Sequence, residues 1–425
     1  MFSINKLKKK NFAVYGLGAT GKSIISYFKK RGFSNYCTYD DYKKSNKKNI
    51  FIKYLKTADF IILSPGINII KSKLKKNLLE NKQKIISDLD LFYMTNSKIK
   101  TIVVTGTNGK STTCKMLEHL LKKNKINSHL GGNIGTPILK LKSNKNTVIV
   151  IEASSYQLSY SKFVKPSCAL ILNISNDHLE WHGNMKNYVN SKFKIFLLQN
   201  RQNISILKQK KLIKIFKKKK FKSRLKIVSP LIYKNINEKI NNDYLNLDNN
   251  LENMSFVYEV SKIFKINKKN FINSMTSFKG LPHRYENFLN KKNIKFINDS
   301  KATSFKASVS ALNQNQNIFW IVGGQPKFKD KFIIKNIKKN IIKCFIIGKH
   351  INFFKSQIKN KIKKHVAKSL ENALLNIFKE IKKYPDKQLT VLFSPASASF
   401  DQYQNFIQRG NEFKKISKLY ARKYL

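Results

Sequence analysis

Two glycine-rich loops carry the residue types that could bind phosphate. Residues 16–23 read GLGATGKS and residues 105–112 read TGTNGKST, and an apolar run precedes each loop. The backbone amides of such a loop, at the start of a helix, can surround phosphate oxygens, and the lysine can offset their charge. The first loop matches the pattern GxxxxGK(S/T) letter by letter, whereas the second has Val104 where the pattern has its leading glycine. The surroundings of each loop therefore have to decide which one holds a nucleoside triphosphate.

Two polar residues downstream favour the second loop as the triphosphate site. Glu152 ends the apolar predicted strand 147–151, where a buried carboxylate is costly unless it is paired or bound to a metal. A carboxylate on a strand facing such a loop is the usual Mg²⁺ partner, so a metal ligand is favoured over a salt bridge. His178 follows the apolar run 169–172 and is either a ligand or a hydrogen-bonded surface histidine.

This interpretation gives a role to each residue type of the second loop. Lys110 reaches the outer phosphates, and the hydroxyl of Ser111 or Thr112 binds Mg²⁺. A purely structural glycine turn is the alternative, which an apolar strand before GKST and a helix after it disfavour. The residues predicted to surround the phosphates are Gly106, Thr107, Asn108, Gly109, Lys110, Ser111 and Thr112.

The first loop also fits the pattern GxGxxG, and Asp40 lies at a suitable distance to meet a ribose. Lys22 and Ser23 would then fall inside the first helical turn, too late to surround phosphate. The pattern supports a domain that binds some nucleotide diphosphate. A nicotinamide-dependent oxidoreductase is the alternative from another class, but it leaves the second loop and Glu152 unused.

The elements that must position these residues recur as strand, glycine loop and helix. Strands apolar on both faces that alternate with helices are typical of parallel sheets covered on both sides. The sequence therefore predicts an α/β protein of three domains in series: a Rossmann-like domain 1–97, a central P-loop ATPase-type domain 98–280 and a Rossmann-like domain 281–425. No elements are assigned between residues 200 and 250. The predicted strands are 12–15, one ending near Asp40, 60–63, 101–104, 147–151, 169–172, 295–297, 318–322, 344–347 and 390–393.

The composition adds limits on partners. The chain of 425 residues has 84 Lys and Arg against 23 Asp and Glu, a formal charge of +61. Lys, Asn and Ile are all common and are encoded largely by A and T, so genome composition explains the excess. The lysines are also spread along the chain without the interleaved aromatic residues of a nucleic-acid platform, so no specific nucleic-acid partner is expected. The densest run, residues 208–226, is interpreted as a solvated helix face or loop.

The four cysteines form no CxxC pair, which fits a reducing compartment. The sequence shows no targeting signal and no apolar stretch of membrane-spanning length, so a cytoplasmic protein without membrane contact is expected. A monomer is also expected.

Eight motifs occur in order along the chain: GTNGKST, GGNIG at 131–135, EASSYQL at 152–158, NDH at 176–178, LPHR at 281–284, NDSKAT at 298–303, SPASASFDQY at 394–403 and RGNEF at 409–413. Together they resemble the motifs of the Mur ligases, the ATP-dependent amino-acid-adding enzymes of peptidoglycan synthesis. The motif NDSKAT is similar in particular to that of the family's D-glutamate-adding branch. A member that adds another amino acid, or the related folate polyglutamylating enzyme, which typically lacks the first domain, is the alternative.

The resemblance implies that the first domain binds UDP-N-acetylmuramoyl-L-alanine, the second ATP with Mg²⁺, and the third D-glutamate. It implies an acyl phosphate intermediate and a carbamylated Lys192. The implied sugar-peptide contacts are Ala19, Thr20, Asp40, Asp41, Asn133 and His178, and the further nucleotide contacts are Asn253, Arg284 and Asp299. The implied contacts of D-glutamate are Lys301, Thr303, Lys327, Ser399 and Phe406. The implied catalytic residues are Lys110, His178, Lys192 and Lys301, and the implied metal ligands are Ser111, Glu152, His178 and the Lys192 carbamate.

Three positions depart from the family pattern. Residues 249–250 are Asn-Asn where the family usually has His-Asn before Asn253, and residues 323–327 lack an acidic residue after the glycines. Phe400 stands where an aliphatic residue is common. The second departure bears on the assignment of Lys327, which lies three residues after the second of those glycines.

Overall fold

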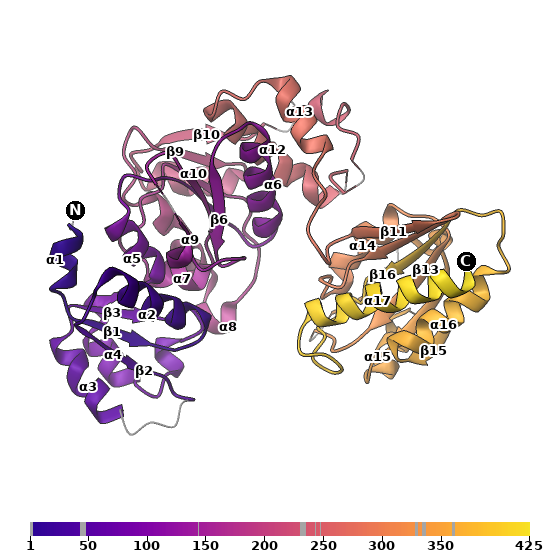
Figure 1. Ribbon diagram of the computed structural model, residues 1–425, viewed down its shortest axis with the longest axis horizontal. Helices are drawn as coiled ribbons and strands as arrows, with labels where there is room; N and C mark the ends of the chain where they lie inside the picture. The colour runs from indigo at the N-terminus through magenta and orange to yellow at the C-terminus, as the bar shows by residue number, and fades with distance from the viewer. Residues whose placement is uncertain are drawn as a thin grey trace. The chain divides into compact units, whose positions relative to one another are not determined.

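The computed structural model describes residues 3–42, 48–142, 144–229, 235–242, 244–246, 248–327, 330–333, 337–358 and 362–425. The chain forms two compact units (Figure 1). The first comprises Met1–Asn241 with Glu252–Phe278, and the second comprises Asn242–Leu251 with Lys279–Leu425. The first unit contains two sheets and the second contains one.

The first sheet has four parallel strands in the order β2-β1-β3-β4. Alternate residues of its central strand β1 face opposite sides of the sheet. Phe12 and Val14 pack in one apolar cluster with α2, and Ala13 and Tyr15 pack in another with α3. Both faces are therefore covered, as the apolar run 12–15 predicted. The elements are α1 Ile4–Lys8, β1 Phe12–Tyr15, α2 Ala19–Arg31, β2 Tyr36–Tyr39, α3 Lys48–Thr57, β3 Phe60–Leu63, α4 Lys75–Glu80 and β4 Ile85–Ile86.

The second sheet has six parallel strands in the order β10-β9-β8-β5-β7-β6. Its strand β5 covers the predicted run 101–104, and β7 and β8 match the runs 147–151 and 169–172 to within one residue. The strands β9 and β10 lie in the segment to which no elements were assigned. The strands are β5 Lys100–Thr105, β6 Ser128–Gly132, β7 Val148–Glu152, β8 Cys168–Ile171, β9 Ile204–Leu207 and β10 Arg224–Ile227. The helices are α5 Asp88–Thr95, α6 Lys110–Lys123, α7 Ser155–Tyr160, α8 Leu179–His182, α9 Met185–Phe193, α10 Lys210–Lys218, α12 Asp248–Ile263 and α13 Lys268–Thr276.

The lysine run 208–226 forms α10 and the start of the edge strand β10. Leu212 and Phe216 of α10 are buried, while Lys210, Lys211 and Lys214 are exposed. The expectation of a solvated helix face is therefore correct for the helical part of the run.

The second unit has a six-stranded sheet in the order β11-β12-β16-β13-β14-β15, in which only β11 is antiparallel. The helix α17 packs with α16 against one face of the sheet. The strands are β11 Glu286–Lys291, β12 Ile294–Asn298, β13 Ile318–Gly323, β14 Ile341–Ile347, β15 Lys364–Lys368 and β16 Leu389–Phe393. The helices are α14 Phe305–Asn313, α15 Ile351–Ile358, α16 Leu370–Ile381 and α17 Phe406–Tyr424.

The structure confirms the α/β fold class, with mostly parallel sheets that alternate with helices. Within the described residues, no helix is both long enough and apolar enough to cross a membrane. The domain boundaries after residues 97 and 280 stay predictions.

Candidate functional site

The second glycine loop joins β5 to α6. Gly106 and Gly109 have φ of 156° and 83°, values that favour glycine. A Cβ on Gly109 would lie 2.1 Å from Asn253 Oδ1, so α12 packs directly on the loop. Val104 is a fully buried residue inside β5, paired in register with Glu152. The literal pattern fails there because an ordinary strand residue occupies the position of its first glycine.

Hydrogen bonds from the segment after β8 fix the loop backbone. Asn173 O accepts from Thr107 N at 2.9 Å, and Asn173 Oδ1 accepts from Asn108 N at 2.9 Å. The Lys110 ammonium bends back over the loop and donates to Gly106 O and Thr107 O at 2.8 and 2.7 Å. Lys110, the predicted phosphate-binding cation, therefore lies against the backbone of the second glycine loop.

Glu152 ends β7 beside this loop and is 2% exposed. Its Oε1 accepts from Asn133 Nδ2 at 2.8 Å, while its Oε2 is buried and has no hydrogen-bond partner in the described part of the chain. A buried carboxylate oxygen without a partner is costly, and a bound cation would satisfy it. The described residues contain no cluster of three or more His, Cys, Asp or Glu side chains suited to a metal. This sparse set fits Mg²⁺, which keeps water and phosphate oxygens as most of its ligands.

Lys192 lies on α9 and is 1% exposed. Its Nζ donates to Gly106 O at 2.9 Å and lies 4.6 Å from the centre of the Tyr188 ring. Burial, together with the nearby Lys110 charge, holds the pKa of Lys192 well below its usual range. The neutral amine is the form that reacts with CO₂, so the surroundings suit the implied carbamate. The sequence pattern alone gave no sign of this residue.

His178 precedes α8 in a left-handed conformation, with φ of 55°. Its side chain is 39% exposed, with Nε2 3.4 Å from Asp177 Oδ2 and Nδ1 3.8 Å from Glu180 Oε1. Its ring centre lies 4.8 Å from that of Tyr156. These contacts leave the choice between a ligand and a surface histidine open, and the ligand role stays a prediction.

The first glycine loop closes on itself and on the strand after it. A Cβ on Gly21 would lie 2.0 Å from Gly16 O, so only glycine fits. Asp40 Oδ2 accepts from Leu17 N at 2.5 Å and Oδ1 accepts from Tyr42 N at 2.9 Å, so Asp40 holds the loop. Lys22 is exposed in the first turn of α2, after the residues that form the loop. Of the other predicted contacts here, Ala19 is exposed, Thr20 is half-buried, and Asp41 accepts from the Tyr15 hydroxyl at 2.6 Å.

The residues predicted to contact D-glutamate follow the carboxyl ends of β12, β16 and β13 in the second unit. These strands are parallel neighbours, so their carboxyl ends lie at the same edge of the sheet. Lys301 Nζ lies 4.0 Å from the centre of the Phe406 ring. Thr303 is half-buried after β12, and Ser399 is buried after β16. Lys327 is exposed after β13.

Arg409 joins the loops at this edge, although its motif in the sequence suggested no role for it. It is 1% exposed, and its Nη2 donates to Ser300 O and Ser397 O at 2.8 and 2.9 Å. These bonds tie the NDSKAT loop to the SPASASF loop. A buried arginine between two loops has no local sequence signal, so its role emerges only from the fold.

Asp299 directly follows β12 and is 9% exposed. Its Oδ2 accepts from Ser394 Oγ at 2.7 Å and its Oδ1 accepts from Tyr285 N at 3.1 Å. Burial raises the pKa of Asp299 to about 7, although the Arg284 charge opposes the shift. Asp299 and Arg284 belong to the second unit, whereas Asn253 belongs to the first.

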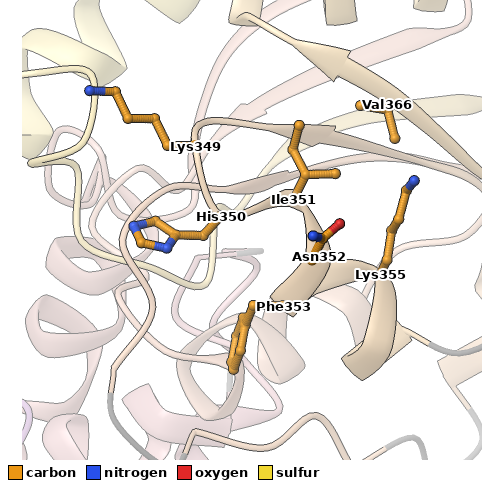
Figure 2. Close-up of a pocket in the computed structure, with 7 residues that line it drawn as sticks. All are labelled: Lys349, His350, Ile351, Asn352, Phe353, Lys355 and Val366. Atoms are coloured by element: carbon orange, nitrogen blue, oxygen red, sulfur yellow. The ribbon is translucent and has the colours of Figure 1, made fainter.

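A hollow of about 540 Å³ opens at the end of β14 (Figure 2). In the view shown, the Lys349 side chain lies at the left and the Lys355 side chain at the right. The lining includes none of the predicted D-glutamate contacts and consists of Lys349, His350, Ile351, Asn352, Phe353, Lys355 and Val366.

Comparison with known proteins identifies the family. A family model described as the Mur ligase middle domain matches residues 104–290. A UDP-N-acetylmuramoylalanine–D-glutamate ligase from Rickettsia bellii is 33% identical, over 96% of this chain and 97% of that protein. The chain belongs to the Mur ligase family. A ligase of the same name from Hydrogenobaculum sp. is 32% identical to this Mur ligase, over 96% of this chain and 98% of that protein.

Solved structures show the same fold at low sequence identity. A MurF ligase from Thermotoga maritima in complex with ADP has a TM-score of 0.56 at 16% identity, over 99% of both chains. MurC from Thermotoga maritima has a TM-score of 0.54 at 15% identity, over 97% of this chain and all of that one. The Mur ligase family is one of ATP-dependent ligases, so this chain is an enzyme of that class, as the motifs indicated.

Proposed function

We propose that this Mur ligase adds D-glutamate to UDP-N-acetylmuramoyl-L-alanine with the hydrolysis of ATP. The observation that carries the proposal is that Lys110, Lys192 and Glu152 all lie beside one glycine loop. Relatives that match nearly the whole chain are named D-glutamate ligases, and this shared name supports D-glutamate as the amino acid that is added.

The proposed reaction is the one that the resemblance to the Mur ligases implies. The L-alanine carboxylate attacks the γ-phosphorus of ATP, ADP leaves, and an acyl phosphate forms. The amine of D-glutamate then attacks the acyl carbon, the phosphate leaves, and an amide remains. Lys110 and the loop amides offset the charge on the phosphate oxygens. Mg²⁺, held by Glu152 with Ser111 or Thr112, His178 and the Lys192 carbamate, would offset the remaining negative charge when bound.

The remaining assignments belong to the same proposal. Uridine diphosphate binds at the first loop, near Ala19, Thr20, Asp40 and Asp41, and the sugar peptide reaches Asn133 and His178. The nucleotide contacts Asn253, Arg284 and Asp299. Lys301, Thr303, Lys327, Ser399 and Phe406 receive D-glutamate, for which a lysine is suited because the substrate carries two carboxylates. The enzyme acts as a cytoplasmic monomer without a nucleic-acid partner.

Phosphate release tests the proposal. With UDP-N-acetylmuramoyl-L-alanine and ATP-Mg²⁺, the enzyme should release phosphate when D-glutamate is added. Omission of either the sugar peptide or D-glutamate is the control. Turnover with L-lysine or diaminopimelate, and none with D-glutamate, would show that this Mur ligase adds another amino acid.

A further inference from the structure

Two buried serine hydroxyls in the second unit lead to the Asp299 carboxylate. Ser394 directly follows β16, and its Oγ lies 2.7 Å from Asp299 Oδ2. Ser308 lies on α14, and its Oγ lies 2.8 Å from Ser394 Oγ. Both serines are 0% exposed, so bulk water does not reach their hydroxyls. The ends of β12 and β16 are thus joined to α14 by hydrogen bonds that lead to one carboxylate.

The direction of these hydrogen bonds follows from the chemistry of the partners. An ionised carboxylate can only accept, so the single hydrogen of the Ser394 hydroxyl goes to Asp299. Ser308 then donates to Ser394 Oγ. The alternative acceptor, Ser394 O, is more distant from Ser308 Oγ, at 3.4 Å, and already accepts from Trp320 Nε1 at 2.8 Å. With Asp299 ionised, the donors therefore run in order from Ser308 to Ser394 to the carboxylate.

Burial and hydrogen bonding act on Asp299 in opposite directions. Burial raises the pKa of Asp299 to about 7, and the hydrogen bond from Ser394 lowers the pKa more than the Tyr285 amide or the Arg284 charge does. The other titratable side chains of the surrounding loops have partners of their own: His283 with Asn298, Glu286 with Lys414, and Lys301 with the Phe406 ring. The ionised form of Asp299 therefore depends chiefly on Ser394.

We propose that Ser394, supported by Ser308, is a positioning residue that keeps the Asp299 carboxylate oriented and able to accept hydrogen bonds from the nucleotide. This inference rests on the proposed contact between Asp299 and the nucleotide. Ser394 acts through Asp299 and touches no reacting atom. A carboxylate that has lost its charge accepts hydrogen bonds more weakly, so nucleotide binding should follow the ionisation of Asp299.

The chain offers a matched control for loss of a buried serine hydroxyl. In β9 of the first unit, Ser205 is also 0% exposed, and its Oγ lies 2.7 Å from both Ser223 Oγ and Gln199 Oε1. Ser205→Ala therefore removes a hydroxyl from a similar arrangement that ends at a neutral amide. Ser394→Ala removes one from an arrangement that ends at a carboxylate, so only its effects should depend on pH.

The Kd for ATP-Mg²⁺, measured by calorimetry at pH 7 and pH 9, tests the effect on the nucleotide. Loss of the Ser394 hydroxyl should disfavour the ionised form of Asp299 by roughly tenfold, as expected for one hydrogen bond to a charged group. Ser394→Ala should therefore bind ATP about 3- to 5-fold more weakly than the wild type at pH 7. At pH 9, where Asp299 is mostly ionised in both proteins, the difference should fall below about twofold. The ratio for Ser205→Ala should be the same at both pH values.

Urea unfolding tests the effect on Asp299 without a nucleotide. The pKa of Asp299 is raised in the folded protein from 3.8 to about 7, so its contribution to stability is lost as pH rises through this range. In Ser394→Ala this loss should continue to higher pH. The stability deficit of Ser394→Ala relative to the wild type should therefore be larger at pH 9 than at pH 6, whereas that of Ser205→Ala should be equal.

Ser308→Ala provides a milder variant, because it leaves the direct donor to Asp299 in place. It should weaken ATP binding in the same direction as Ser394→Ala, by about twofold at pH 7, and it carries the same tests if Ser394→Ala does not fold. A loss of ATP affinity that is the same at pH 7 and pH 9 in these variants would overturn the inference. A stability deficit that is the same at pH 6 and pH 9 would also overturn it.

The two proposals can fail separately. Absence of D-glutamate-dependent phosphate release by the wild type would refute the proposed function alone, because the Kd for ATP-Mg²⁺ and urea unfolding need no turnover. A pH-dependent stability deficit in Ser394→Ala without a pH-dependent loss of ATP affinity would refute the positioning role, even where the ligase activity is established.

Discussion

Lys192 shows at the scale of one residue how burial changes the chemistry of a side chain. An exposed lysine is a hydrated cation, but Lys192 is enclosed by α9 and the second loop, with Lys110 close by. Both influences disfavour its charged form. A lysine in this state can take up CO₂ and become an anion, which reverses the sign of its charge beside the loop.

We expect Lys192→Ala to lower kcat by roughly 100-fold or more, since it removes a preorganised charge from the reacting centre. Acetate or formate should restore part of the activity, because a small carboxylate can occupy the vacated space. Lys186→Ala is the control, since Lys186 is exposed on the same helix. Turnover of the wild type, Lys192→Ala and Lys186→Ala is measured by phosphate release. Near-wild-type turnover by Lys192→Ala would contradict a role for Lys192 in the reaction.

Asp88 gives a second prediction at this scale, on stability and pH. It is buried, accepts from Gln157 Nε2 at 3.1 and 3.2 Å, and burial raises its pKa to about 6 from 3.8. Between these values the folded protein holds a proton that the unfolded chain has lost. Asp88 therefore lowers the stability of the fold as pH rises from about 4 to about 6.

Asp88→Asn should remove this dependence. At pH 8 the variant should exceed the wild type in free energy of unfolding, by at most about 3 kcal/mol. The difference should shrink towards pH 4, where both side chains are neutral. Urea unfolding across this range measures it, with the exposed Glu80→Gln as control. A difference that stays constant with pH would show that the carboxyl does not titrate in this way.

At the scale of elements, the turn from β1 into α2 depends on close contact between two glycines. A Cβ on Gly21 would overlap Gly16 O, which also accepts from Ser64 Oγ at 2.8 Å and cannot move freely. Gly18, three residues earlier, has a φ of −67°, and a Cβ placed on it would meet nothing within 4 Å. The same substitution should therefore have different consequences at the two positions.

Gly21→Ala should lower the unfolding free energy by about 1–3 kcal/mol, as expected for overpacking. It should also raise the KM for the UDP-sugar peptide, because the loop that we propose as its binding site must shift. Gly18→Ala should keep the unfolding midpoint close to that of the wild type. Thermal unfolding of the ligand-free proteins tests the loss of stability expected for Gly21→Ala. Equal unfolding midpoints for Gly21→Ala and Gly18→Ala would contradict it.

At the scale of the whole molecule, the formal charge of +61 opposes compaction. Few carboxylates are present to offset it, and several that pair do so with exposed lysines, as Glu118 does with Lys115 and Lys122, which are 43% and 55% exposed on the same helix. Surface pairs of this kind contribute little to stability. Screening by salt should therefore matter more for this protein than for one of balanced charge.

Raising NaCl from 0.01 to 0.15 M shortens the Debye length from about 30 to about 8 Å. We expect the unfolding midpoint to rise by at least about 2–4 °C, the shift that corresponds to about 1 kcal/mol in domains of this size. KCl at the same ionic strength should act equally, because screening does not depend on the cation. A midpoint that does not change with salt would show that the repulsion is already compensated. Binding of mixed-sequence DNA should also weaken over this range.

Local sequence patterns were sufficient to predict the central strands, the two glycine loops and the order of the family motifs. Apolar runs such as 12–15 and 60–63 became β1 and β3 with the predicted bounds, because strands buried on both faces leave a local apolar signal. Edge strands β10 and β15 are less apolar, and their pairing depends on neighbours far away in the chain. The sequence pattern therefore missed them.

Local sequence does not determine which side chains meet at the second loop, because these contacts depend on the packing of distant segments. Asn253 lies on Gly109, Tyr188 reaches Thr107 and Lys192 reaches Gly106, across separations of 81 residues or more. In a chain with 84 Lys and Arg, no local feature distinguishes Lys192 from its neighbours. Its pKa and its contacts come from burial by distant segments, and burial arises only when those segments pack together.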